Sequence, residues 1–431
     1  MKGNFQIIIL IVFIIAAVFG VLVFSGMIPL GSQSSSTGAQ GTVVLWGTEK
    51  STVMFPLIES FNQANTSFVL KYEEKSPDTF DSDLLEALAS GTGPDMFFIS
   101  DDLAFKYSNK IYTIPYASFP LNTFKNSFVG AGEVFLTSNG VLALPLTVDP
   151  MMMYYNRSML DANSIANPPA YWDEFTNLVP VLTKKDDKGL ITKSTVAMGQ
   201  FSNVLHAKDL LATLFMQAGN PIITEKDSSF ISVLGDSNGK YDLGSILNYY
   251  TDFSDPLKDV YSWNKSFSNS QDAFSKEDLA FYFGYASELQ SLIDKNPNQN
   301  FLVAPMPQIR NSTFKLTSGH TTGIAISAFS KNLNTALTAA SLMTNGDFAG
   351  KFATSLGVAP VRRDLLKVIP TDSYSPTFYS SAFFARGWLD PSPKDTDNIF
   401  QGMVEKVLSN SMSPASSVTD ASAKLGLLLI K

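Results

Sequence analysis

The chain has 431 residues, of which 45% are hydrophobic. This length exceeds what one compact core usually holds, so two lobes are expected. The formal net charge is -8 and no cluster of Lys or Arg is present, which argues against nucleic acid as a partner because phosphate binding needs a basic surface. Cysteine is absent, which excludes disulfides, thiolate metal sites and a lipidated Cys anchor, while two histidines are too few for most zinc sites, so no metal or other cofactor is expected.

The first predicted element is a membrane-spanning helix over residues 7–28. This strongly apolar stretch would rise about 33 Å at about 1.5 Å per residue, close to the roughly 30 Å of a bilayer core. A cleaved signal peptide is the main alternative, but its apolar stretch is usually shorter and no clear cleavage site follows here. Because Lys2 precedes the run and no charge follows before Glu49, residues 1–6 are expected in the cytoplasm and the body outside. Residues 29–41, rich in Gly and Ser, are predicted to be a flexible linker.

The body begins with alternating strand and helix patterns. Strands are predicted at residues 43–46, 68–72 and 94–99. The first helix between them carries Met54, Ile58 and Phe61 on one face, and Gly91 ends the second. This βαβαβ order implies a parallel sheet with right-handed crossovers, which binds ligands at the carboxyl ends of its strands.

Further strand and helix patterns continue to the C-terminus. Extended apolar segments are predicted at residues 141–146 and 151–155, split by residues 147–150. A helix is expected to start near Trp172. The remaining predicted elements are helices at residues 205–217 and 335–343 and strands at residues 279–283 and 322–328. No internal repeat is present, so a repeat architecture is not indicated.

Several motifs stand in a fixed order over nearly the whole body. They are VVLWGTEK, LLEALASGTGPDMFFIS, GVLALPLTVDPMMMYYNRSML, NPPAYWDEF, TGIAISAFSKN and LGVAPVRRDLL. Their order resembles that of the extracellular solute-binding proteins of ABC importers, in the carbohydrate-binding group that includes maltose-binding protein. The N-terminus departs from the bacterial members, which often carry a lipobox Cys or a cleaved signal.

The resemblance implies an α/β, two-lobed, periplasmic-binding-protein type II fold with hinge strands and an interlobe cleft, preceded by one N-terminal transmembrane helix. Lobe 1 would comprise residues 42–147 and 321–362, and lobe 2 residues 148–320 and 363–431. The expected activity is capture of a small solute, a mono- or oligosaccharide, by a monomer that serves the permease subunits of an ABC importer. Proteins of this class are a known example of hinge closure around a ligand.

Sugar binding needs carboxylates and amides for hydroxyls and aromatic rings for apolar faces. On the family pattern, the expected ligand-binding residues are Trp46, Thr48, Glu49, Asp101, Asp102, Asp149, Asn203, His206, Trp263, Tyr285 and Trp388. Structural roles are the alternatives: Trp46 in the core, Asp101 and Asp102 as helix caps, and Asp149 as a turn residue before Pro150. His206 could instead be a surface or cap histidine, and Trp388 could pack the last helices. Trp172 and the Met151–Met153 run are assigned to structure.

Other functions remain open at this point. No G-x-S-x-G, H-E-x-x-H or phosphate-loop motif is present, so an enzyme is not expected, although a glycosidase carboxylate pair is a less favoured alternative. A sensor subunit would have the same fold. The solute could also be a polyamine, a phosphodiester or a metal complex. Glu49, Asp101, Asp102 and Asp149 would suit a cationic solute.

Overall fold

The computed structural model describes residues 39–227, 229–235 and 241–430. The chain divides into two units, residues 1–39 and residues 40–431, and the second is a compact body. Across the described residues, no helix is both long enough and apolar enough to cross a bilayer. The expected anchor at residues 7–28 and the stub before it lie outside the described residues, as does most of the linker.

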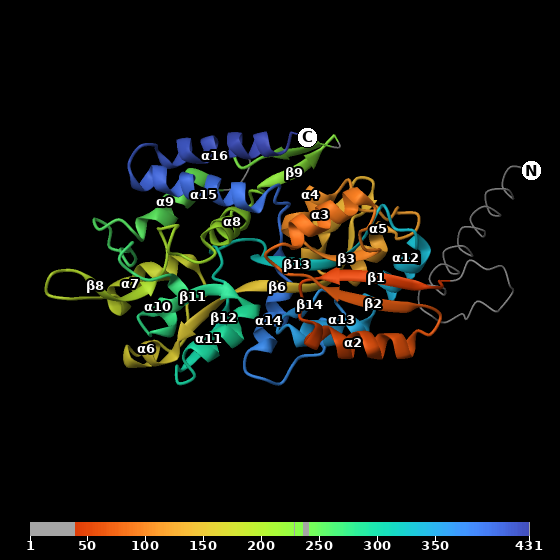
Figure 1. The fold of residues 1–431 in the computed structure, drawn as a ribbon. Coiled ribbons are helices and arrows are strands. Elements are labelled where there is room, and N and C mark those ends of the chain that lie inside the picture. Colours follow the sequence, from red (N-terminus) through yellow and green to blue (C-terminus); the bar gives the residue numbers. More distant parts are fainter. Residues whose placement is uncertain (1–38, 228, 236–240, 431) are drawn as a thin grey trace, which may run out of the picture. The chain divides into compact units, whose positions relative to one another are not determined.

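The start of the body confirms the predicted βαβαβ order (Figure 1). The elements are β1 (Thr42–Gly47), α2 (Ser51–Ala64), β2 (Val69–Glu74), α3 (Phe80–Ser90) and β3 (Met96–Ser100). β1 pairs in parallel with β2 and β3. Met54, Ile58 and Phe61 are the buried residues of α2, so the predicted apolar face is the one that packs. Gly91 caps α3 with a φ of 71°, a left-handed conformation that glycine adopts without strain.

Two long antiparallel strands form the middle of the sheet. β6 runs unbroken over Ala143–Asn156 and pairs with β13 (Thr317–Ile326). The predicted split between two strands at residues 147–150 is therefore wrong, and so is the alternative that Asp149 is a turn residue. Residues 147 and 148 pair with β13 on one side and with β14 (Ala359–Pro360) on the other, which keeps the segment extended although a proline follows.

The sheet joins two groups of strands through β6 and β13. Its order is β2-β1-β3-β13-β6-β11-β8-β7, with β12 also on β6 and β15 on β13. The second group comprises β7 (Lys184–Lys185), β8 (Ile191–Val196), β11 (Leu279–Tyr285) and β12 (Phe301–Pro305). We call the part built on β1–β3 the first lobe and the part built on β7, β8, β11 and β12 the second lobe. The lobe boundaries near residues 147 and 321 stay a prediction.

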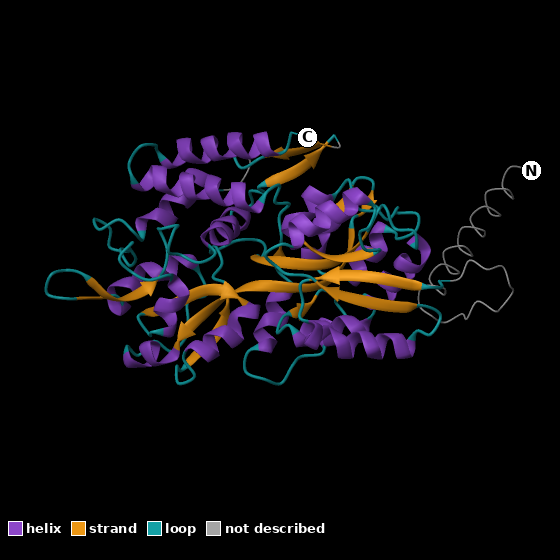
Figure 2. Ribbon diagram, viewed as in Figure 1, coloured by secondary structure: helices purple, strands orange, loops and turns teal. Residues whose placement is uncertain are grey.

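Helices cover both lobes (Figure 2). They are α4 (Asp101–Tyr107), α5 (Leu121–Ser127), α6 (Arg157–Ala162), α7 (Phe175–Leu182), α8 (Ala207–Gln217), α9 (Leu243–Asp252), α10 (Ser270–Ser275), α11 (Leu289–Lys295), α12 (Leu333–Met343), α13 (Gly346–Ser355), α14 (Ser375–Ala382), α15 (Pro393–Leu408) and α16 (Pro414–Leu428). The short elements are η1 (Gly130–Phe135), η2 (Trp172–Glu174), η3 (Ala286–Glu288), η4 (Leu365–Lys367), β4 (Leu136–Thr137), β5 (Gly140–Val141), β9 (Ile223–Lys226), β10 (Ser229–Ser232) and β15 (Ala385–Arg386). α8, α12 and β11 confirm their predictions, whereas β13 begins five residues before the predicted strand.

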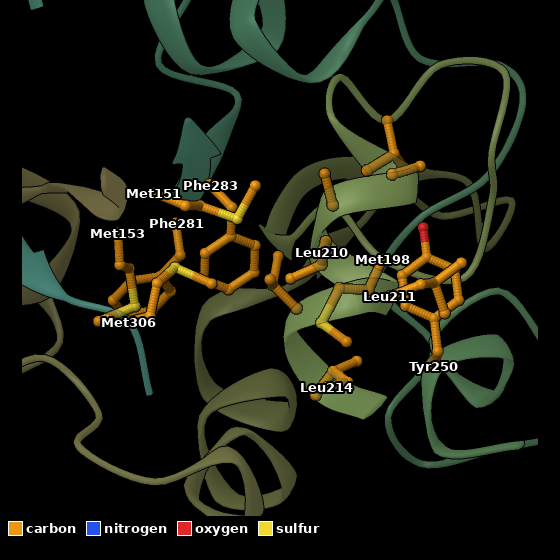
Figure 3. Packing of buried hydrophobic residues seen from close by; sticks show 14 of the residues in the cluster. Met151, Met153, Met198, Leu210, Leu211, Leu214, Tyr250, Phe281, Phe283 and Met306 are labelled. Carbon is orange, nitrogen blue, oxygen red and sulfur yellow. The ribbon is translucent and has the colours of Figure 1, made fainter. Parts of the chain in front are cut away.

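The core of the second lobe holds the start of α8 in place. Met151 and Met153 of β6 pack beside Phe281 of β11, while Leu210 and its neighbours on α8 pack in the same cluster (Figure 3). The methionine run at residues 151–153 is fully buried, which confirms its structural assignment. The indole N–H of Trp172 donates to Oε1 of Gln217 at the far end of α8 (2.7 Å). α8 is thus fixed on its inner side, and so are the polar residues of its first turn.

Candidate functional site

A cavity of about 510 Å³, including its mouth, lies where both lobes meet the shared strand β13. Its walls come from α4 of the first lobe, from α8 and β11 of the second, from β13, and from the segment after β15. The lining residues are mostly charged or aromatic: Asp101, Asp102, Lys208, Asp209, Tyr285, Ser318, Gly319, His320, Arg386, Gly387, Trp388 and Asp390. Small polar cavities with aromatic walls suit a small solute with several hydrogen-bonding groups.

A histidine joins carboxylates from the two lobes. Oδ1 of Asp101, the first residue of α4, accepts the backbone N–H of Thr321 (3.1 Å) and lies 3.2 Å from Nδ1 of His320. Nε2 of His320 lies 3.8 Å from Oδ2 of Asp209 on α8. Burial lowers the pKa of His320, but the two carboxylates outweigh it and raise the pKa well above its usual value. The ring is therefore a cation shared between the lobes.

The ring of Tyr285 packs between two imidazoles. Its centroid is 4.9 Å from that of His206 and 4.7 Å from that of His320. Nε2 of His206 lies 2.7 Å from Oε1 of Glu288, and the same carboxylate accepts the backbone N–H of Tyr285 (2.7 Å). His206 adopts a left-handed backbone with a φ of 60° just before α8. These contacts fix the orientation of the Tyr285 ring at the cavity wall.

The opposite wall carries a buried ion pair beside an indole. Nζ of Lys208 lies 2.8 Å from Oδ2 of Asp390, and the carboxylate also accepts the Thr396 hydroxyl (2.8 Å). The ammonium lies 6.0 Å from the ring centroid of Trp388, and that indole stacks on Phe400 at 6.1 Å. One side of Trp388 is thus packed against the second lobe, while the residue also lines the cavity.

Asp102 and Arg386 complete the polar surface. Asp102 accepts the hydroxyl of Ser100, and burial, together with the neighbouring Asp101, raises its pKa. Nη1 of Arg386 donates to the carbonyl of Ala385 (2.7 Å). The cavity therefore offers both hydrogen-bond acceptors and hydrogen-bond donors to a solute.

The structure brings four of the predicted residues together at this cavity: Asp101, Asp102, Tyr285 and Trp388. Asp149 lies nearby, opposite His320 in the β6–β13 ladder, and its carboxylate accepts the backbone N–H of Ser287 (3.1 Å). Burial raises the pKa of Asp149 to about 6. The carboxylate supports the cavity wall, and direct contact with a solute stays a prediction.

Asn203 and His206 line a second, polar hollow next to the cavity. The two hollows share Lys208 and Asp209. The amide of Asn203 donates to the carbonyls of Asn264 (3.0 Å) and Phe267 (3.2 Å), so it also holds the local loops together. The role expected of these two residues in solute binding stays a prediction.

The other predicted aromatic residues are covered by protein groups. Nε1 of Trp46 donates to Glu73 on β2 (2.9 Å), and Nζ of Lys75 lies 3.6 Å above its ring. Trp263 is fully buried and stacks on Phe267 at 4.4 Å, so it belongs to the core of the second lobe in this structure.

Thr48 and Glu49 follow β1 and do not line the cavity. The carbonyl of Glu49 accepts the Tyr72 hydroxyl (2.6 Å), and burial raises the pKa of its carboxyl group. Their expected contact with a solute stays a prediction.

Five charged residues of the cavity were not predicted: Lys208, Asp209, His320, Arg386 and Asp390. Two signals in the sequence could have found three of them. His320 lies at the predicted boundary between the lobes at residues 320 and 321, and Lys208 and Asp209 lie near the start of the helix predicted at residues 205–217. In the described ranges no three His, Asp or Glu side chains converge in a way that could hold a metal ion.

Comparisons with known proteins agree with this architecture. The sequence model of the bacterial extracellular solute-binding proteins matches residues 56–377. A protein of Brucella abortus (strain 2308), named as a binding protein, is 20% identical over 429 residues, which cover 96% of this chain and 98% of the relative.

Two solved structures have the same fold. A cyclo/maltodextrin-binding protein in complex with maltotetraose has a TM-score of 0.73 at 16% identity, covering 91% of this chain and 98% of the other. An ABC transporter solute-binding protein from Thermotoga lettingae with bound α-D-tagatose has a TM-score of 0.65 at 19% identity, covering 91% and 100%. At these identities the structural likeness establishes the two-lobed α/β fold.

Proposed function

The chain belongs to the family of bacterial extracellular solute-binding proteins, and from this premise we propose that it captures a mono- or oligosaccharide between its lobes and delivers it to an ABC importer. The observation that carries the proposal is the cavity formed jointly by α4, α8 and β13. A solute there touches both lobes, so it is bound best when they are close together. The proposal includes no catalytic step.

The chemistry of the cavity supports a sugar as the solute. Trp388 and Tyr285 supply aromatic surface, which packs against the C–H face of a sugar ring. Asp101 and Asp102 supply carboxylate acceptors for its hydroxyls. Two proteins of the same fold were solved with maltotetraose and with α-D-tagatose.

Closure would rotate the lobes about the two shared strands. β6 and β13 are the long strands that run from one lobe to the other. A few residues within such strands can absorb a rotation while each lobe stays rigid. A solute that contacts Asp101 of the first lobe and Trp388 of the second has more contacts in the closed form. It would therefore shift the population towards that form by its difference in affinity.

A combined scattering and fluorescence titration tests the proposal. The full chain is first screened by thermal shift against sugars, polyamines, phosphodiesters and iron complexes, since a ligand at 100 times its Kd adds about 2.7 kcal/mol of stability. The best sugar should then reduce the radius of gyration and change tryptophan fluorescence with the same concentration dependence. If saturating sugar changes neither signal, or if only a different class of solute does, the sugar proposal fails.

We further propose that residues 7–28 stay on the mature protein as a single membrane-spanning anchor, with the N-terminus in the cytoplasm and the body outside. The support is the length and apolar character of this run and the position of Lys2 before it. Intact-mass measurement of membrane-extracted protein should give the mass of the whole chain. A mass that lacks the first 25 or so residues would mean a cleaved signal peptide instead.

A further inference from the structure

One cation at the cavity has no ion-pair partner among the residues that the structure describes. Lys208 is paired with Asp390 at 2.8 Å, and His320 lies between Asp101 and Asp209. Arg386 lines the same cavity but has no carboxylate within ion-pair distance in the described part of the chain, and Glu133 acts on it only from farther away. Because every other cationic group of the cavity already has its counter-charge, Arg386 is the one that is free to bind an anion.

The guanidinium of Arg386 is held in a defined position. Arg386 is the second residue of β15 and pairs with Ser318 of β13. Its Nη1 donates to the carbonyl of Ala385 (2.7 Å). The group lies against Gly130 of η1, where a Cβ atom would come within 2.2 Å of Cζ, so only glycine leaves room for it. The side chain is thus supported by a contact from the first lobe.

Most of the hydrogen-bonding capacity of this group is unused. A guanidinium has five N–H donors in a rigid, planar fork, and the carbonyl of Ala385 occupies one of them. The fork matches the two oxygens of a carboxylate, which it binds in a bidentate manner. Arg386 is partly open to solvent, yet desolvation by the surrounding protein lowers its pKa. Glu133 opposes this shift from beyond ion-pair distance and Arg363 adds to it, so the charge is only partly compensated within the protein.

The carboxyl groups of the cavity are also largely paired. Asp101 and Asp209 share His320, and Asp390 binds Lys208. Within the described ranges Asp102 has the hydroxyl of Ser100 as its one hydrogen-bond partner, while His320 and Lys208 act on it from a distance. The cavity therefore presents one free guanidinium and one free carboxyl group. A neutral sugar would donate a hydroxyl to the carboxyl group of Asp102 but would leave the guanidinium of Arg386 without a counter-charge.

We infer that the preferred solute is an acidic saccharide whose carboxylate is bound by Arg386, while Asp102 accepts a ring hydroxyl and Trp388 packs on the ring. This inference rests on the proposed function and narrows its substrate class from sugars in general to uronates. Arg386 is then the residue that determines specificity, because it is the group that a neutral sugar leaves unpaired.

The test compares matched sugars that differ only in their charge. Glucuronate and galacturonate are titrated calorimetrically into the full chain, with glucose and galactose as the neutral counterparts. We expect each uronate to bind about 10- to 100-fold more tightly than its neutral counterpart, the range of a charge-assisted hydrogen-bonded pair. The uronate affinity should fall as NaCl is raised from about 0.05 to about 0.5 M, because salt screens the pair.

Substitution of Arg386 then assigns the preference to one side chain. In R386Q the ratio of uronate to neutral-sugar affinity should fall to about one, and in R386K it should be intermediate, because Lys keeps the charge but not the fork. R310Q is the matched control, since Arg310 is an exposed arginine paired with Asp173 and Glu174 and does not line the cavity. It should keep the wild-type ratio.

The outcomes separate this inference from the proposed function. Neutral sugars that bind as tightly as uronates, or a preference that persists in R386Q, would overturn the inference and leave the sugar-binding proposal in place. If none of the four sugars binds and the sugars of the wider screen give no shift, both proposals fail together. The melting temperature of each variant is recorded, so that a folding defect is not mistaken for lost affinity.

Discussion

Nδ1 of His320 lies 3.2 Å from Oδ1 of Asp101, and the two residues come from elements with different roles. Asp101 begins α4 of the first lobe, whereas His320 is on β13, which both lobes share. The other ring nitrogen faces Asp209 of the second lobe at 3.8 Å. A protonated imidazole at this position attracts carboxylates from both sides, so its charge favours the arrangement in which the lobes are together.

The charge of His320 predicts a loss of stability at alkaline pH. Because its folded-state pKa is raised above the unfolded value, its contribution is fully present below about pH 6.5 and is lost as the pH rises through the folded pKa. The melting temperature of the ligand-free protein should therefore fall over this alkaline range. In H320Q that part of the pH dependence should disappear. An unchanged slope in H320Q would assign the alkaline loss to other groups.

Asp149 predicts a stabilising substitution. Burial raises the pKa of its carboxyl group from 3.8 to about 6, so the ionised form is disfavoured in the folded protein. Its stabilising contribution is present below pH 3.8 and is lost as the pH rises to about 6. D149N keeps an oxygen to accept the N–H of Ser287 and removes the charge, so it should stabilise the protein by about 1–2 kcal/mol at neutral pH.

Urea unfolding of wild type and D149N checks this prediction. The difference in unfolding free energy should vanish as the pH falls below 3.8, where Asp149 is protonated in both the folded and the unfolded protein. Equal stability at neutral pH would mean that the carboxylate is better solvated than its burial indicates.

The elements that could be predicted from the sequence are those whose pattern is local. β1, α2 and β3 follow from the spacing of their own apolar residues. Their alternation with helices predicts parallel strands, whose carboxyl ends lie at the same edge of the sheet. The continuity of β6 through residues 147–150 could not be predicted, because it depends on pairing with β13 and β14, which lie far along the chain. A proline next to an acidic residue is otherwise typical of a turn.

The residues of the site also divide into those with a local signal in the sequence and those without one. Asp101 and Asp102 were predicted because they directly follow a strand, which is where parallel sheets bind ligands. Arg386 has no local signal, since its importance depends on Gly130 and on the lack of an ion-pair partner among the described residues, both of which only the fold reveals. Trp263 was predicted as a surface for sugar, but aromatic type alone does not distinguish a cavity wall from a core, and its ring is buried against Phe267.

Trp388 predicts a loss of sugar affinity on truncation, separate from the stability that its packing supplies. The indole lines the cavity and stacks on Phe400 on its other side. W388A should weaken binding of the best sugar by about 1–2 kcal/mol, because the ring face is lost. Calorimetric titration measures this difference.

Trp172 supplies the matched control for W388A. It is buried in the same lobe and donates to Gln217, away from the cavity. W172F should lower the unfolding free energy by about 1–3 kcal/mol and leave sugar affinity unchanged. If both variants lose affinity equally, the loss reflects damage to the second lobe and not a missing sugar contact.

The last prediction concerns a contact between the lobes outside the cavity. Phe230 of β10 packs edge-on against Phe105 of α4, with ring centroids 5.6 Å apart. On the paired strand β9, Glu225 accepts the backbone N–H (3.2 Å) and the hydroxyl (2.8 Å) of Ser138. Both contacts join the second lobe to the first, so they exist only while the lobes are together.

Loss of this contact should therefore lower sugar affinity from a distance. An aromatic pair of this geometry contributes about 0.5–1.5 kcal/mol, so F230A should raise the Kd about two- to tenfold. The intrinsic stability of each lobe should change little, because Phe230 is only partly buried. Scattering of ligand-free F230A should show the same or a larger radius of gyration than wild type, since the closed population falls.

F314A is the control for this experiment, because Phe314 is an aromatic residue that is 45% exposed and lines a different hollow of the second lobe. It should keep the wild-type affinity. If F230A also keeps it, the closed form gains nothing from the Phe105 contact, and the affinity of the clamp is set within the cavity alone. If F230A weakens binding while R386Q removes only the preference for uronates, closure and specificity are controlled by separate residues.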